Sequence, residues 1–117
     1  MKELADTPAE LVSEIAFVLL LCNADKKHVP FDVIARQAAS AYPDDFSAIQ
    51  DGRIVPQLAK IREALSEAKL QEWGYATGDW HFGWRLTKKG GIFAKRVEKL
   101  ALRRIYGTDN PRLEHAA

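Results

Sequence analysis

The hydrophobic positions near the start of the chain follow the period of an α-helix. Thr7-Pro8-Ala9-Glu10 has the composition of a helix start, with a capping Thr, a Pro at the first helical position and a Glu three residues after the cap. Apolar residues then recur at helical spacing as far as about Asn23, at Leu11, Ile15, Val18, Leu19 and Cys22. This pattern predicts a largely buried helix.

Two further helices are predicted in the next part of the chain. Asp32 is expected to cap a helix over residues 32–41. Its inner side is expected to hold Val33, Ile34, Ala38 and Ala39. Residues 43–52 are predicted to form a loop or an irregular helical turn, because Pro43 disfavours helical geometry in the residue before it. A third helix is predicted over residues 53–69, and its inner face would hold Ile54, Leu58, Ile61, Leu65 and Ala68.

The period changes from helical to alternating after the third helix. Residues 70–75 and 80–86 alternate as strands do, and turn residues fill positions 76–79 between them. This pattern predicts a β-hairpin whose tip is Gly78-Asp79. Thr87 is expected to cap a final helix that reaches about Tyr106, and residues 108–117 are predicted to be a flexible tail.

The composition fits one domain, over residues 1–107, of mainly helical α+β class. The chain has 117 residues, of which 47% are hydrophobic and 28% are charged, as in ordinary soluble globular proteins. One cysteine, Cys22, excludes an intramolecular disulfide and a cysteine-based metal site, and it favours a cytoplasmic location. The longest apolar run covers residues 15–22, which is far too short for a membrane span.

Charge is distributed unevenly although the net charge is only +1. As far as Gly52 there are four Lys or Arg and nine Asp or Glu, whereas from Arg53 onward there are thirteen and seven. A basic second half is what a protein that binds a polyanion requires. The alternative is that these side chains are simply solvated on helices rich in Lys and Glu.

The order of the predicted elements resembles a winged helix-turn-helix domain over about residues 8–105. The run that carries the resemblance begins at Leu65 and closes with Trp84-Arg85-Leu86-Thr87-Lys88-Lys89-Gly90. In PadR- and MarR-type regulators the strand returning from the wing closes in a similar way, as aromatic-x-Leu-Thr-x-x-Gly. The segment Tyr42-Pro43-Asp44-Asp45-Phe46 is also similar to long turns in winged domains of some restriction and phage-defence proteins.

This resemblance implies duplex DNA as the partner and a regulatory role, with the third helix as the recognition helix. The residues expected to enter the groove are Arg53, Gln57, Lys60 and Arg62. Lys88 and Lys89 are expected to contact phosphate at the amino end of the last helix. The alternative is that these cations are only solvated, because Glu63 and Glu67 on the same helix would repel DNA.

The aromatic residues of the predicted hairpin allow a second hypothesis. Trp84 is expected to be a core residue. Trp80 and Phe82 either cover an extended core opposite Trp73 or Tyr75, or form an exposed patch for a protein partner or for unpaired bases. A wing tip without Lys or Arg favours the second use, in which the chain is a protein–protein interaction module of a larger complex.

A homodimer and the absence of enzymatic activity are the last predictions. Family members often dimerise through a C-terminal helix, and the residues expected at such an interface are Leu102, Ile105 and Tyr106; the alternative is that this helix packs on the first. The three histidines lie in separate segments, and no phosphate-binding loop is present. The chain is therefore predicted to be no enzyme and to hold no metal or cofactor.

Overall fold

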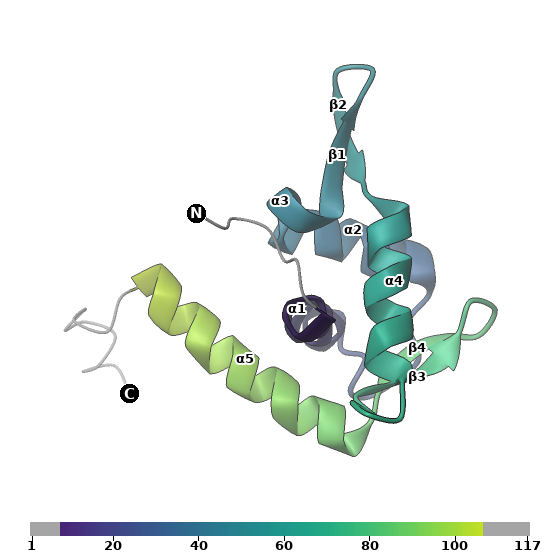
Figure 1. The fold of residues 1–117 in the computed structure, drawn as a ribbon, viewed down its shortest axis with the longest axis vertical. Coiled ribbons are helices and arrows are strands. Elements are labelled where there is room, and N and C mark those ends of the chain that lie inside the picture. The colour runs from purple at the N-terminus through teal and green to yellow at the C-terminus, as the bar shows by residue number, and fades with distance from the viewer. Residues whose placement is uncertain (1–7, 107–117) are drawn as a thin grey trace.

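The computed structural model describes residues 8–106, with side chains for residues 9–100. In this part of the chain the fold is α+β, with five helices and two antiparallel β-hairpins (Figure 1). In chain order the elements are α1 (Pro8–Leu21), α2 (Phe31–Ala41), α3 (Pro43–Phe46), β1 (Ser47–Gln50), β2 (Arg53–Pro56), α4 (Leu58–Lys69), β3 (Ala76–Asp79), β4 (Gly83–Leu86) and α5 (Lys88–Tyr106). The predicted tail at residues 108–117 and the predicted cap Thr7 lie outside the described residues.

Helix α1 is the centre of the core and packs against both α4 and α5 (Figure 1). Its apolar positions repeat at helical spacing, and Val12, Ile15, Val18 and Leu19 are fully buried. The prediction of a largely buried first helix is confirmed. Among the described residues, no helix combines the length and the apolar character that crossing a bilayer requires.

Helix α2 begins one residue earlier than predicted. Pro30 occupies the N-cap position and no side chain caps the helix, so the assignment of Asp32 as the cap is wrong; its carboxylate lies in the first turn. Ile34 and Ala38 face the core as expected, whereas Val33 is exposed. The inner face is therefore narrower than the sequence pattern suggested.

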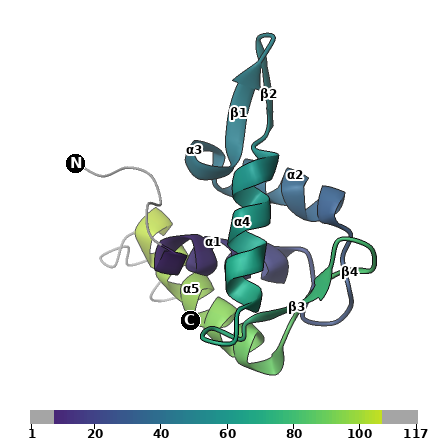
Figure 2. The ribbon, with the colours of Figure 1, turned by 45° about the vertical axis from the view of Figure 1, so that its right-hand side comes forward.

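The segment predicted as a loop, together with the start of the predicted third helix, forms a β-hairpin. Strands β1 and β2 pair with Ile49 opposite Ile54 and Gln50 opposite Arg53. Both turn residues, Asp51 and Gly52, have positive φ values, 53° and 76°, as a two-residue type I′ turn requires. The hairpin stands away from the helices in both views (Figures 1 and 2).

Helix α4 therefore begins at Leu58, not at Arg53. Ile54 is 74% exposed on the hairpin, and Leu58 is also exposed, so neither belongs to the inner face. Ile61, Leu65 and Ala68 are buried as predicted. Pro56 is the last residue of strand β2, so its missing backbone N–H interrupts no helical hydrogen bond.

The second hairpin is shifted along the chain relative to the prediction. Strand β3 pairs with β4 with Ala76 opposite Leu86, so residues 80–82 form the turn and residues 70–75 are not a strand. An isolated bridge joins Val29 to Trp84, with backbone N–H···O distances of 2.8 Å in both directions. The segment before α2 thus lies along the free edge of β4.

The junction between β4 and α5 agrees with the sequence. The amide of Gly90 donates to Thr87 Oγ1 at 2.9 Å, and this hydroxyl donates to the carbonyl of Gly74 at 2.6 Å. A Cβ atom at Gly90 would overlap the carbonyl oxygen of Tyr75. The predicted cap is confirmed, and the close approach of Tyr75 explains why a glycine occupies position 90.

Candidate nucleic-acid interface

Helix α4 has one face in the core and one face open to solvent. Its buried residues are Ile61, Ala64, Leu65 and Ala68. The opposite side exposes Arg62, Ser66 and Lys69, which follow one another at intervals of four and three residues. This spacing places the three polar side chains in one row along the helix.

Two of the four residues predicted for the recognition helix do not lie on it. Arg53 belongs to β2 and sits beside the tip of the first hairpin, in a shallow hollow with Gln50, Asp51 and Val55. Gln57 is the N-cap residue of α4, and its backbone N–H donates to the carbonyl of Phe46 at 2.7 Å. The helix prediction for these two positions is wrong because the hairpin takes residues 53–56.

The other two residues are on α4 but have different surroundings. The Lys60 ammonium lies 3.4 Å from the carboxylate of Asp45, whose side chain is buried. Arg62 is exposed, and its guanidinium carbon lies 5.4 Å from the centre of the Phe31 ring. Arg62 is therefore available to a ligand at the surface, whereas the ammonium of Lys60 is engaged in an ion pair.

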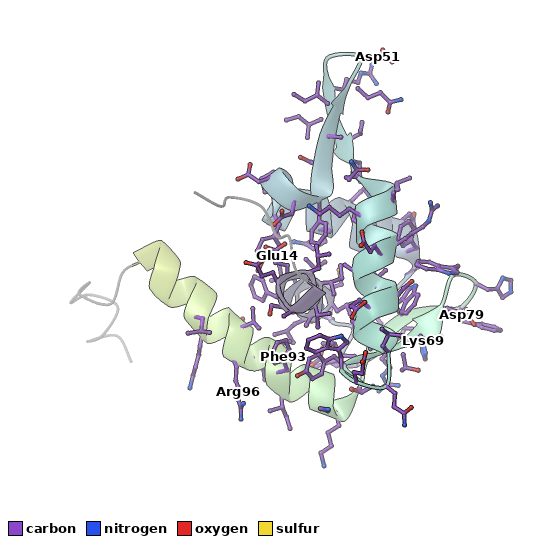
Figure 3. The ribbon with its side chains drawn as sticks, viewed as in Figure 1. Glu14, Asp51, Lys69, Asp79, Phe93 and Arg96 are labelled. Atoms are coloured by element: carbon purple, nitrogen blue, oxygen red, sulfur yellow. The ribbon has the colours of Figure 1, made fainter. Side chains whose placement is uncertain are left out.

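A cleft runs between α4 and the second hairpin. It consists of two hollows of about 410 and 520 Å³ that share Ser66 and Trp80 as lining residues. Arg62 and Glu63 line one hollow, and Lys69 and Asp79 line the other. Figure 3 shows Lys69 and Asp79 on the side where α4 meets the hairpin. Because each hollow has one cation and one carboxylate, this face is balanced in charge.

The tip of the second hairpin is aromatic. The Asp79 carboxylate accepts hydrogen bonds from the amides of Phe82 and His81, at 2.7 and 2.9 Å. These contacts, with the Phe82 amide as the largest cause, lower the pKa of Asp79 below its ordinary value. Asp79 therefore fixes the turn as a carboxylate, and Trp80, His81 and Phe82 form the tip that was predicted at Gly78-Asp79.

The aromatic residues of this hairpin differ in burial. Trp84 is buried in the core, as predicted. Trp80 is 49% exposed and packs edge-on against Phe31 and Trp84, with ring centres 5.3 and 4.8 Å apart. Phe82 is 74% exposed. Trp80 thus covers part of the core opposite Phe31, not opposite Trp73 or Tyr75, and Phe82 faces solvent.

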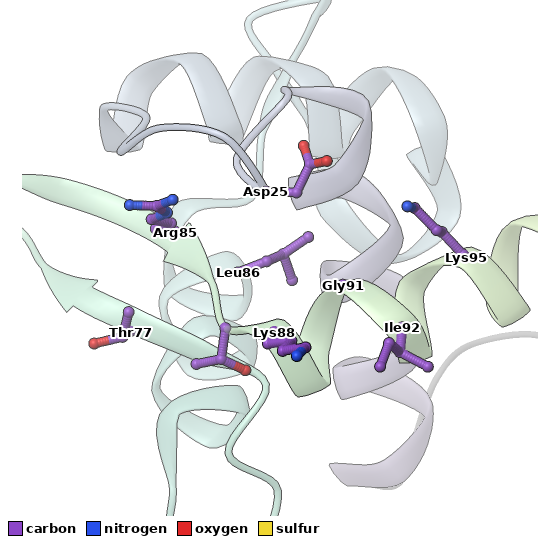
Figure 4. Close-up of a pocket in the computed structure, with 9 residues that line it drawn as sticks. Asp25, Thr77, Arg85, Leu86, Lys88, Gly91, Ile92 and Lys95 are labelled. Carbon is purple, nitrogen blue, oxygen red and sulfur yellow. The ribbon is translucent and has the colours of Figure 1, made fainter.

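The two lysines predicted to touch phosphate lie apart from the open face of α4. Lys88 lines a third hollow, of about 570 Å³, together with Arg85 and Lys95 (Figure 4). The Lys89 ammonium lies 5.4 Å from the centre of the Tyr75 ring. The third hollow shares no lining residue with the two hollows beside α4, so the predicted DNA contacts do not line one cleft.

Ser66 and Lys69 were not among the residues predicted for the site from the sequence. Their spacing of four and seven residues from Arg62 indicates, from the sequence alone, that the three side chains share one face of the helix. The contact between Arg62 and Phe31 has no such signal, because it joins α4 to the start of α2. The predicted dimer residues Leu102, Ile105 and Tyr106 are in α5, but their side chains lie outside the described residues.

Cys22 is partly buried against the core, and burial raises the pKa of its thiol to about 11. A thiol with such a pKa is almost entirely protonated at neutral pH, which disfavours nucleophilic chemistry. Within residues 8–106, no three His, Cys, Asp or Glu side chains are grouped so that they could hold a metal ion.

Comparison with known proteins finds no match to this chain among family models, curated proteins or solved structures.

Proposed function

We propose that this chain is a winged-helix domain that binds duplex DNA, with α4 as the helix that enters the groove. The order of elements supports the fold: a helix, an extended residue that pairs with the hairpin, two further helices, a hairpin and a last helix. The first hairpin and α3 are then an insertion between the two central helices. A regulatory role in the cytoplasm and a homodimer through the end of α5 belong to the same proposal.

The open face of α4 is the observation that carries DNA binding. Arg62 and Lys69 are seven residues apart, which corresponds to about 10 Å along a helix. The Lys69 ammonium donates one hydrogen bond to the carbonyl of Gly78 at 2.6 Å, and its other protons are left for a phosphate oxygen. A major groove about 12 Å wide accepts a helix, and Arg, Ser and Lys are side chains that bind base edges or phosphate. Packing on Phe31 fixes the guanidinium of Arg62 in advance, which lowers the conformational entropy lost on binding.

Fluorescence anisotropy with a labelled mixed-sequence duplex tests this assignment. We expect micromolar binding at low salt that weakens as salt increases. The double variant Arg62→Gln/Lys69→Gln should bind about tenfold more weakly, because it loses two cations from the proposed contact surface. Lys26→Gln/Lys27→Gln is the matched control, since these exposed cations line neither hollow beside α4. Equal affinities of the two double variants would contradict the role of α4.

A second candidate function is docking of a protein partner through the tip of the second hairpin. It is favoured by the exposure of Phe82 and by the absence of Lys and Arg from residues 79–83. Exposed aromatic residues of this kind are frequent anchors of protein interfaces. A pull-down with wild-type and Phe82→Ser baits tests it: a protein retained by the wild type alone, with duplex affinity unchanged in the variant, would favour this function over DNA binding.

A further inference from the structure

The exposed charged residues on the outward face of α5 are all basic over the part with described side chains. Between Lys88 and Leu100 its exposed charged residues are Lys88, Lys89, Lys95, Arg96 and Lys99. Glu98, the one acidic residue of this stretch, is half-buried, and the two remaining exposed residues, Ile92 and Leu100, are apolar. This face therefore has five cations and no exposed carboxylate.

Within the described part of the chain, these cations are not neutralised by acidic side chains, although the Lys89 ammonium lies over the Tyr75 ring. Among the residues with described side chains, no carboxylate lies within ion-pair distance of any of the five. Lys88 and Lys95 also line the hollow at the start of α5, and Arg85 extends the basic surface onto strand β4 (Figure 4). Asp25 is the single acidic residue that lines this hollow.

The length of the face matches a nucleic-acid backbone. From Lys88 to Lys99 the helix rises about 16 Å, at about 1.5 Å for each residue. A stretch of duplex of this length has about ten phosphate charges on its two strands. A row of five cations can replace several condensed counterions there, which is the main source of affinity in sequence-independent binding.

This face and the open face of α4 are on different sides of the molecule. Helix α1 packs between α4 and α5, and both views agree on this arrangement (Figures 1 and 2). Arg96 points away from the body of the domain (Figure 3). A straight duplex bound to α4 cannot also lie along α5, because α1 and the core separate the two faces.

We propose that the Lys88–Lys99 face of α5 is a second, sequence-independent binding surface for the DNA backbone, so that one molecule bridges two duplexes. The inference rests on the proposed function, because α4 supplies the first contact. Repulsion between like charges on this face also disfavours a homodimer through residues 88–99. Dimerisation through α5 would therefore have to use the C-terminal part of the helix, which contains Leu102, Ile105 and Tyr106.

A capture assay tests bridging. Beads with a biotinylated duplex are loaded with the full chain, washed and offered a fluorescent duplex, and anisotropy with a single duplex is measured in parallel. We expect the captured fluorescence to be at least tenfold lower for Lys95→Gln/Arg96→Gln/Lys99→Gln than for the wild type. Binding of a single duplex through α4 should persist in this variant. Lys95→Arg/Arg96→Lys/Lys99→Arg keeps every charge and should capture as the wild type does. Circular dichroism verifies that both variants are folded.

The possible outcomes separate the two proposals. Wild-type protein that binds one duplex but captures no second one would overturn bridging and leave the function of α4 standing. Undiminished capture by the glutamine variant would also overturn it, since the second duplex would then be held elsewhere, for example by α4 of another copy. No binding to any duplex would overturn the proposed function itself. Binding to anionic vesicles but not to DNA, through the same three cations, would replace DNA by a membrane and equally overturn the proposal.

Discussion

The Lys60 ammonium pairs with the buried carboxylate of Asp45 at 3.4 Å, and this contact ties α4 to α3 at the base of the first hairpin. A buried carboxylate that loses its cation has a large desolvation cost. Lys60 is partly exposed, so the effect is smaller than for a fully buried pair. We expect Lys60→Met, which keeps the aliphatic stem, to lower the free energy of unfolding by about 1–3 kcal/mol.

Urea denaturation of Lys60→Met, Asp45→Asn and the double variant measures this coupling. The effects of the single changes should not add, because both remove the same ion pair. Additive effects would show that the two side chains act independently. Duplex affinity should fall less in Lys60→Met than in the Arg62→Gln/Lys69→Gln variant, because the Lys60 ammonium is held by Asp45 and makes no proposed contact with DNA.

The rings of Trp84 and Phe82 should have opposite roles in stability and binding. Trp84 is buried among the core residues, so Trp84→Ala should cost about 3–5 kcal/mol of unfolding free energy. Phe82 is 74% exposed, so Phe82→Ala should change stability by less than about 0.5 kcal/mol. Thermal and urea unfolding of the two variants provide the comparison. A large loss in Phe82→Ala would mean that the tip of the hairpin is packed, and it would remove the basis for a docking site.

The neighbouring glycines at the start of α5 offer a matched pair of substitutions. A methyl group at Gly90 would overlap the Tyr75 carbonyl, so Gly90→Ala should destabilise the protein by about 2–4 kcal/mol. At Gly91 no atom lies within 4 Å of the added carbon, so Gly91→Ala should stabilise the helix by about 0.5–1 kcal/mol. Unfolding midpoints that shift in the same direction would contradict this packing of α5 against Tyr75.

Cys22 should make stability depend on alkaline pH. Burial raises the pKa of its thiol from 9.0 to about 11, so the folded state binds the proton more tightly than the unfolded state. The contribution of the buried, protonated thiol to the free energy of unfolding is fully present below about pH 9 and is lost as the pH rises through about 11. Urea denaturation at pH 8, 9, 10 and 11 should therefore show a steeper decline in the wild type than in Cys22→Ala. Identical pH profiles would indicate a thiol that is open to water.

Sequence and structure agree best where local chemistry decides the outcome. The period of apolar residues was sufficient to predict α1, and the Thr87 hydroxyl and Gly90 sufficed to locate the start of α5. These features depend on residues at most four positions apart. The approximate class, helices with a hairpin before the last one, follows from the same local patterns.

The first hairpin was missed although its signal is in the chain. Asp51-Gly52, with the β-branched residues Ile49 and Ile54 one position beyond its neighbours, is typical of a type I′ turn. Ile54, however, also continues the helical spacing of Leu58, Ile61 and Leu65, so two periods compete over the same residues. The second hairpin is shifted for a different reason: the Asp79 carboxylate accepts hydrogen bonds from the backbone amides of His81 and Phe82, which stabilise a turn at residues 80–82.

By itself, the sequence determined the apolar face of α1 and the buried positions Ile61, Leu65 and Ala68 of α4, because helical periodicity is a local property. Only the tertiary structure decided that Arg62 and Lys69 share a cleft with Trp80, whereas Lys88 and Lys95 lie on another side of the molecule. The physical reason is packing: α1 buries its apolar surface against both helices and thereby sets their open faces apart.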